Sequence, residues 1–481
     1  MPVVSSGTFN WIRPESSAHR PHPVAIGFLV GTLIGLAAGC RATNQAEIDL
    51  ARSAFAHGDL PTARQQLVRL VEQADRDAVP AELDLAIVEL ASGEARAAES
   101  RLRRLRDSFD ESGGQQFAHD AASLLADDRI RQFQAAPYEQ VLIRAMLAVC
   151  SLSQDASDAE SYLHQAVMKQ ADLDRQFNDE RTSLLDDPSH VPPSQPIAFA
   201  PYMRGVLREA THRDYDDARR SYQLVSSIRP TFLPAADDRE RASHGVHSQP
   251  GHGVLYVIAL VGEGPRLQSV DAPLTSAALS AASTMLLTQI GDEDDVPPLP
   301  SIKTVRVPGV LTPDSPLAAI QVSHDVGVFS DQRFVGATQS ITDINEMMRA
   351  EVSARQPMVM ARAVARRAMK EAAVEAARRK LELGGATGSL FGWAASSAWV
   401  ATEDADTRSW SLLPRDIQVL RTELPVGRRD IQLTPVGWYG EPIGPPIRRT
   451  VTVDDGRNSY LTVIAPSTVV YAVGPSSLEQ S

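Results

Sequence analysis

The chain has 481 residues, of which 43% are hydrophobic and 22% are charged, and its formal net charge is −13. This length allows two or three domains, because a single hydrophobic core usually stops growing near ~250–300 residues. The composition excludes wholesale disorder. The negative charge argues against nucleic acid as the main partner, since phosphate binding needs a concentrated basic surface.

The N-terminus has the pattern of an export signal. A polar, mildly basic stretch is followed by an uncharged run from Pro23 to Gly39, and a helix of that length is shorter than the ~30 Å hydrocarbon core of a bilayer. A short apolar segment that ends in small residues is typical of a secretory signal. The end of this one, Ala37-Ala38-Gly39-Cys40, resembles the lipobox of bacterial lipoproteins. A cleaved soluble export signal and an uncleaved anchor helix are the alternatives.

The lipobox resemblance implies that residues 1–39 are a signal peptide and that Cys40 carries the lipid. The chain would then be anchored in the membrane by acyl groups. Arg41 follows the cysteine in place of the Asp that retains enteric lipoproteins in the inner membrane, so we expect the outer membrane, facing the periplasm. The second cysteine, Cys150, lies in the apolar stretch "AMLAVCSL" and is expected to be buried as a small hydrophobic residue, with a reactive thiol as the alternative.

A repeat with a spacing of 35 residues follows. "GDLPTARQQLVRL" begins at Gly58 and "GEARAAESRLRRL" begins at Gly93. Each predicts a turn and then a helix with apolar or small residues at the fifth, ninth and twelfth positions after the glycine, which share one helical face. These residues are Ala63, Leu67 and Leu70 in the first copy and Ala98, Leu102 and Leu105 in the second.

The same pattern recurs twice with weaker turns. Gln154 precedes Ala159, Leu163 and Ala166, and Arg213 precedes Ala218, Tyr222, Val225 and a closing Pro230. The pattern resembles the tetratricopeptide repeat, which implies four helical hairpins within residues 40–230 and a groove that binds a protein segment. Plain helical hairpins without a binding function are the alternative.

Residues 231–253 are polar, charged and without periodicity, which predicts a linker. The linker contains His244, His247 and His252. Their spacing raises the question of a metal site, but no cysteine accompanies them, and we expect histidines of a flexible segment and no bound metal.

From Val254 the pattern changes to strands. The apolar run 254–261 and the segments 266–274, 301–310 and 317–329 are predicted strands, and the acidic stretch 291–300 is predicted to be a solvated loop. A helix with an N-cap at Thr342 or Asp343 should break near Pro357, where a second amphipathic helix begins and runs to about residue 383. The uncharged segment 383–402 is expected to pack against that helix as a long helical hairpin, with a membrane-dipping role as the alternative.

The C-terminal part is predicted to be mostly antiparallel sheet. Strands 416–424 and 428–436 are joined by Pro425-Val426-Gly427, a further hairpin over 448–466 has Asp455-Gly456 in its turn, and 468–473 closes the sheet. The expected fold is therefore multidomain, an all-α tetratricopeptide-like solenoid followed by an α+β domain. The expected domains are a signal peptide (1–39), helical repeats (40–230), a linker (231–253), an α+β domain (254–474) and a disordered tail (475–481).

The order of these elements resembles an uncharacterised bacterial family of tetratricopeptide-repeat lipoproteins. The resemblance rests on "GHGVLYVIAL", "ARAVARRA" and above all "DTRSWSLLPRDIQVLRTELPVG". The family has no established reaction, so it implies an envelope lipoprotein without supplying catalytic residues.

Motifs for nucleophilic, metal-dependent or nucleotide chemistry are absent from the sequence. The best site candidate is the cluster Asp406, Arg408 and Trp410, for which the alternative is a salt bridge with an aromatic plug. We expect a non-enzymatic, lipid-anchored scaffold without cofactor that binds envelope proteins through its repeats. The alternative is a cell-wall or glycan hydrolase, or a peptidoglycan- or glycan-binding module, in the C-terminal domain.

Overall fold

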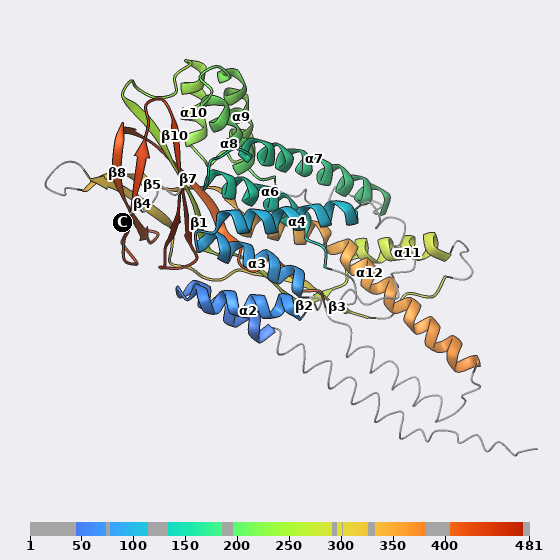
Figure 1. The fold of residues 1–481 in the computed structure, drawn as a ribbon. Coiled ribbons are helices and arrows are strands. Elements are labelled where there is room, and N and C mark those ends of the chain that lie inside the picture. The colour runs from blue at the N-terminus through green and yellow to red at the C-terminus, as the bar shows by residue number, and fades with distance from the viewer. Residues whose placement is uncertain are drawn as a thin grey trace, which may run out of the picture. The chain divides into compact units, whose positions relative to one another are not determined.

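The computed structural model describes residues 45–73, 77–113, 133–184, 196–290, 296–300, 302–325, 332–380 and 405–474. The fold combines α-helices with three β-sheets in the described residues, so the predicted mixture of helix and sheet is confirmed (Figure 1). Cys40, the signal segment, the whole of 383–402 and the tail 475–481 lie outside the described residues.

The first half consists of helices that pack in chain order, and together with the helix over residues 45–56 they form four hairpins within the described ranges, followed by one further helix. Their bounds are α2 (Leu60–Glu72), α3 (Ala78–Ala91), α4 (Ala95–Gly113), α6 (Pro137–Leu152), α7 (Ala159–Leu184), α8 (Phe199–Glu209), α9 (Tyr215–Ile228) and α10 (Pro234–Ser243). The second helices of the hairpins are α2, α4, α7 and α9, and these carry the predicted repeat faces.

The repeat pattern correctly identifies the buried faces of the second helices. Every predicted face residue is at most 6% exposed: Ala63, Leu67, Leu70, Ala98, Leu102, Leu105, Ala159, Leu163, Ala166, Ala218, Tyr222 and Val225. Gly58 and Gly93 occupy the predicted turns with φ of +93° and +82°, a conformation that favours glycine. Pro230 is exposed and follows the end of α9 at Ile228, as expected of a residue that stops a helix.

The third and fourth turns reach the left-handed conformation without glycine. Ala156 has φ of 61° and His212 has φ of 57°, and such a conformation costs an L-residue about 1–2 kcal/mol. His212 is held there by a 2.7 Å hydrogen bond between its Nε2 and the carbonyl oxygen of Gly456. A contact from the C-terminal half therefore compensates for the missing turn glycine.

The predicted linker is wrong for residues 234–243, which form α10. Tyr202 of α8 donates a 2.7 Å hydrogen bond to Asp238 of α10, and Arg241 of α10 binds both carboxylate oxygens of Glu209 at 2.7 and 2.8 Å. Buried polar contacts of this kind hold the short helix against its neighbours although its sequence has no apolar stripe.

The described part of the second half is built from strands and two further helices. Their bounds are β1 (His252–Glu263), β2 (Arg266–Pro273), α11 (Ser276–Ile290), β3 (Thr304–Leu311), β4 (Ala319–Asp325), β5 (Gln332–Ala337), β6 (Gln339–Asp343), α12 (Ile344–Lys380), β7 (Pro414–Pro425), β8 (Gly427–Val436), β9 (Ile447–Val453), β10 (Asn458–Ala465) and β11 (Tyr471–Val473). A five-stranded sheet has the order β11-β10-β1-β7-β6, a four-stranded sheet has the order β5-β4-β8-β9, and β2 pairs with β3. All pairs are antiparallel except β1 with β10.

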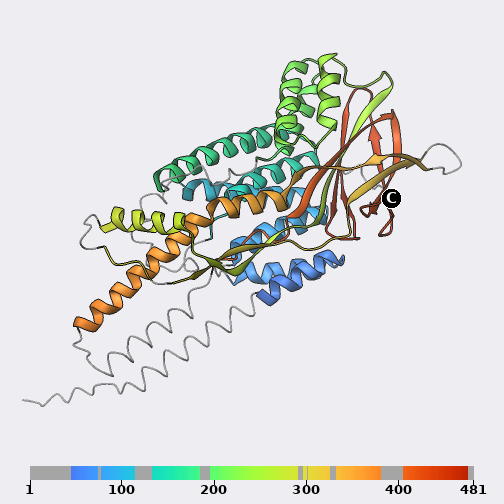
Figure 2. The ribbon, with the colours of Figure 1, turned by 180° about the vertical axis from the view of Figure 1, so that it is seen from behind.

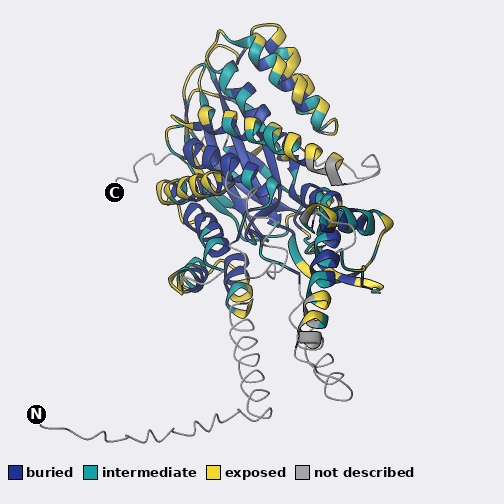
Figure 3. Cartoon of the chain, turned by 90° about the vertical axis from the view of Figure 1, so that its right-hand side faces the viewer, coloured by how far each residue is buried: buried dark blue, intermediate teal, exposed yellow. Residues whose placement is uncertain are grey.

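Strand β1 lies at the centre of the core. Tyr256 and Ile258 belong to the same apolar cluster as the helices of the first half, whereas the intervening Leu255 and Val257 pack with the four-stranded sheet. Because successive side chains of a strand point to opposite faces, the five-stranded sheet has the helices on one face and the four-stranded sheet on the other. Figure 3 shows these buried strands between partly exposed helices. From Ile48 onward the chain clusters as one compact unit.

Several predictions of strand pairing are wrong. Strands β7 and β8 follow each other directly but belong to different sheets, and so do β9 and β10, which were expected to form a hairpin. The turns at Gly427 and Gly456, both with positive φ, carry the chain from one sheet to the other. The predicted break at Pro357 is also wrong, because α12 continues through it. Met358 and Ala361 are buried there against α11 and β3, beside which α12 runs (Figure 2), and this packing offsets the cost of the missing N–H group.

Candidate functional site

The predicted cluster lies on an extended segment before β7, residues 405–413, which we call the strap. Arg408 donates to both carboxylate oxygens of Asp406, from Nε at 2.9 Å and from Nη2 at 2.7 Å. Its guanidinium group also lies 5.7 Å from the centroid of the Phe133 ring. Asp406 and Arg408 are thus brought together, as predicted, in a bidentate ion pair.

Trp410 does not join that pair. Its side chain is 1% exposed and packs in the helical core cluster, and its backbone N–H donates a 2.7 Å hydrogen bond to Glu139 of α6. Two residues further on, the N–H of Leu412 donates to Asp84 of α3 at 2.7 Å, and the Ser411 hydroxyl donates to the other oxygen of Asp84 at 2.6 Å. The strap is therefore attached to two helices through its backbone.

Asp84 and Glu139 are buried acidic residues of the site that the sequence did not indicate. They are 2% and 1% exposed. Burial raises the pKa of Asp84 to about 7, although its bonds to Ser411 and Leu412 oppose the change. Burial likewise raises the pKa of Glu139 to about 7, against hydrogen bonds from Trp410, Ala136 and Tyr138. Their signal in the sequence is an acid inside an apolar helical segment, "LDLAIV" and "PYEQVLI", which calls for a buried donor partner.

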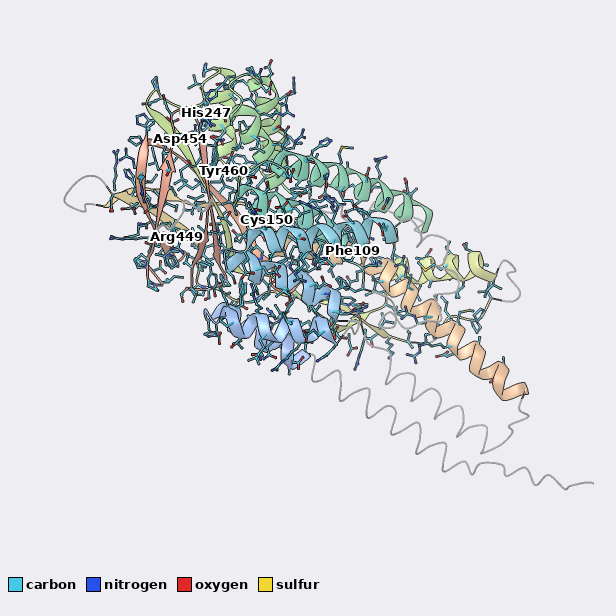
Figure 4. All side chains as sticks on the ribbon, in the orientation of Figure 1. Phe109, Cys150, His247, Arg449, Asp454 and Tyr460 are labelled. Atoms are coloured by element: carbon cyan, nitrogen blue, oxygen red, sulfur yellow. The ribbon has the colours of Figure 1, made fainter. Side chains whose placement is uncertain are left out.

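The first helices of the hairpins, which include α3 and α6, are covered by the C-terminal half, and we call them the inner helices. Almost all of α3 and all but two residues of α6 are buried, in contrast to the half-exposed second helices. Ser153, at the end of α6, shares a 2.8 Å hydrogen bond with Thr462 of β10. Cys150 and Tyr460 lie near this meeting of helix and sheet (Figure 4). The face formed by these inner helices is occupied by the strap and the five-stranded sheet.

Cys150 is a free, fully buried thiol, which confirms its interpretation as a small hydrophobic residue. Burial raises the pKa of this thiol above its ordinary value, so the reactive thiolate is disfavoured.

A cavity of about 200 Å³ lies beside the strap. Asp406, Arg408 and Ser409 form one of its sides, and the N-terminal end of α6, strands β2 and β3, and helix α12 form the others. The predicted ion pair therefore borders a cavity, whereas Trp410 does not line it.

The histidines of the predicted linker do not converge. His247 is 3% exposed, its Nε2 lies 2.8 Å from Oδ1 of Asn458, and burial lowers the pKa of its ring. His244 is exposed. Within the described ranges no cluster of three or more His, Cys, Asp or Glu residues could hold a metal ion.

Comparison with known proteins yields no match to a family model, to a curated protein or to a solved structure. Among the described residues, no helix is long and apolar enough to span a bilayer.

Proposed function

We propose that the protein is a non-enzymatic scaffold of the bacterial cell envelope, anchored by a lipid on Cys40, that acts by binding other envelope proteins. The repeated hairpin pattern supports an architecture like that of tetratricopeptide-repeat proteins, which bind protein segments. The observation that carries the proposal is that the buried acids at the site, Asp84 and Glu139, accept hydrogen bonds from the strap. These acids hold the strap against α3 and α6. In this proposal the ion pair of Asp406 and Arg408 is likewise a structural contact of the strap.

Because the strap and the five-stranded sheet cover the inner helices, a partner would bind elsewhere on the hairpins. The second helices of the hairpins, which we call the outer helices, present exposed apolar side chains. Met168 on α7 is 47% exposed and Leu224 on α9 is 46% exposed. A partner segment would therefore contact the outer faces of the hairpins, while the strap remains in place on the inner faces.

Site-specific photo-crosslinking in cells tests this arrangement. A photoreactive residue at position 168 or 224 of the full chain should capture the same envelope protein. The matched control is position 450, an exposed Thr on β9, which should not capture it. Capture only from position 450, or from none of the three, would contradict binding through the outer helices. Loss of capture in a Cys40→Ala background would tie the interaction to the anchor.

A glycan-binding module is the second candidate, and one turn of the structure favours it. Trp438 and Tyr439 are 67% and 97% exposed. The turn is closed by a 3.0 Å bond from Gly440 N–H to the Gly437 carbonyl, and the Tyr439 N–H donates to Glu441. Arg415, itself buried, lies 5.2 Å from the Trp438 ring centroid and supports the ring. Rigid aromatic rings with an apolar face and a polar edge suit a sugar ring, which has the same two sides.

Sedimentation with purified peptidoglycan sacculi separates this candidate from the first. The double substitution Trp438→Ala and Tyr439→Ala should release the chain to the supernatant, whereas Phe334→Ala, at an exposed aromatic of β5 in the sheet that contains β8, should not. Equal sedimentation of the unaltered chain and both variants would eliminate the turn as a glycan site. The hydrolase alternative is tested by zymography of the full chain with Asp406→Ala, and we expect no cleared zone with or without the substitution.

A further inference from the structure

The walls of the cavity beside the strap are apolar and come from four separate elements. Met348 and Val352 lie one turn apart on α12, so they share a face of that helix. Leu267 of β2 and Val307 of β3 face the same space, and Tyr138 of α6 lines it from the first half of the chain. Met348, Val307 and Tyr138 are at most 6% exposed, so the walls are part of the packed core.

The size of the cavity restricts what it could hold. An engineered cavity of ~150 Å³ lined by apolar side chains stays dry and binds benzene. At about 200 Å³, this cavity has room for a group somewhat larger than benzene on the same scale. It also combines apolar walls with a few polar side chains, as small-molecule sites do.

The charged residues at the cavity are already paired. Arg408 binds Asp406, and Arg355 of α12 binds Glu351 one turn earlier. Arg355 also lies 5.0 Å from the centroid of the Phe177 ring. Glu139 receives its hydrogen bonds from the backbone of Ala136 and Trp410 and from the Tyr138 hydroxyl. A charged ligand would have to separate one of these pairs, and a neutral one would not.

From this size, lining and pairing, we propose that the cavity is a binding site for a neutral, hydrocarbon-like group somewhat larger than benzene. The group inserts between α12 and strands β2 and β3, and the strap closes one side. The site is independent of the proposed scaffold function, because it requires neither the lipid anchor nor an envelope partner.

Binding of naphthalene to the purified full chain tests the proposal by ligand-observed NMR. Naphthalene should bind at least tenfold more tightly than 2-naphthoate, the charged molecule of similar shape. Val352→Trp, which fills the cavity, should weaken naphthalene binding at least tenfold. Leu287→Trp is the matched control, because this partly exposed residue of α11 does not line the cavity, and it should bind as the unaltered chain does.

A second variant covers the case in which Val352→Trp does not fold. Met348→Ala enlarges the cavity, so the larger neutral dye N-phenyl-1-naphthylamine should gain affinity and fluorescence relative to the unaltered chain. Absence of naphthalene binding to the unaltered chain would overturn the proposal. Equal binding of naphthalene and naphthoate would overturn its requirement for a neutral ligand, and unchanged dye binding by Met348→Ala would overturn the location.

Discussion

Replacing Asp84 by Asn should change how the stability of the protein depends on pH. In the folded chain the pKa of Asp84 is raised from its ordinary value of 3.8 to about 7, mainly by burial. The folded state therefore holds this proton more tightly than the unfolded state between these two values. Since the unfolded chain then binds fewer protons, the free energy of unfolding falls as the pH rises through this range.

The size of the effect follows from the two pKa values. At ~1.4 kcal/mol per unit, Asp84 alone makes the free energy of unfolding about 4 kcal/mol lower above pH 7 than near pH 4. Between pH 5 and pH 6 this corresponds to a slope of about −1.3 kcal/mol per pH unit, which shrinks as the pH passes 7. Asn keeps an oxygen for the Leu412 N–H and can donate its amide to Ser411, so the variant should fold and lose that part of the slope.

Urea unfolding of the full chain at half-unit intervals from pH 5 to pH 8 measures both slopes. Glu139 is buried with a similarly raised pKa, so the variant should retain a weaker fall of the free energy of unfolding with rising pH. Asp237→Asn, at an exposed carboxylate of α10, serves as the control and should leave the slope unchanged. If Asp84→Asn also left it unchanged, the argument that Asp84 is protonated in the folded protein below pH 7 would be refuted.

Three further predictions concern the strap, the helical hairpins and the anchor. Glu139→Ala leaves the buried N–H groups of Ala136 and Trp410 without an acceptor and should lower the free energy of unfolding by about 2–6 kcal/mol. Glu139→Gln, which retains one acceptor, should lower it less in the same urea titration. Gly205→Ala would place a Cβ 2.7 Å from the ring of Tyr222, whose hydroxyl is held by Glu209. The crowding should lower the free energy of unfolding by about 1–3 kcal/mol. Gly440→Ser is the control, because no atom lies within 4 Å of the added Cβ and the only cost should come from the positive φ of Gly440. Cys40→Ala should move the chain from the membrane pellet to the soluble fraction after cell fractionation, and retention in the pellet would favour an uncleaved anchor helix.

The confirmed predictions of the helical faces depend on short-range patterns. The helical faces around Ala63, Ala98, Ala159 and Ala218 follow from a period of 3.6 residues, which neighbours along the chain determine. The cap at Asp343 is confirmed by a 3.0 Å bond from the N–H of Glu346. Helix α11 was missed although its start carries a signal, since the Thr275 hydroxyl accepts a 3.2 Å bond from the Ala278 N–H.

At the candidate site, the sequence indicated the pairing of Asp406 with Arg408, because an acid and an arginine two residues apart on an extended segment lie on the same side. It did not indicate the attachment of Trp410 and Leu412 to α6 and α3. Those bonds join residues 271 and 328 positions apart in the chain. Without the fold, no local pattern reveals which buried acid meets which backbone N–H.

What the sequence by itself determined is therefore the buried faces of the second helices of the hairpins and most of the strands of the second half, together with the turns at Gly58 and Gly93. These features arise from residues within a few positions of each other, whose spacing and backbone preferences are independent of the rest of the chain. Only the tertiary structure decided that β8 and β9 leave the sheet of β7 and β10, that α12 continues through Pro357, and that the inner helices are covered by the chain's own strap. Each of these depends on burial against distant segments, and the free energy of that burial outweighs the local preference.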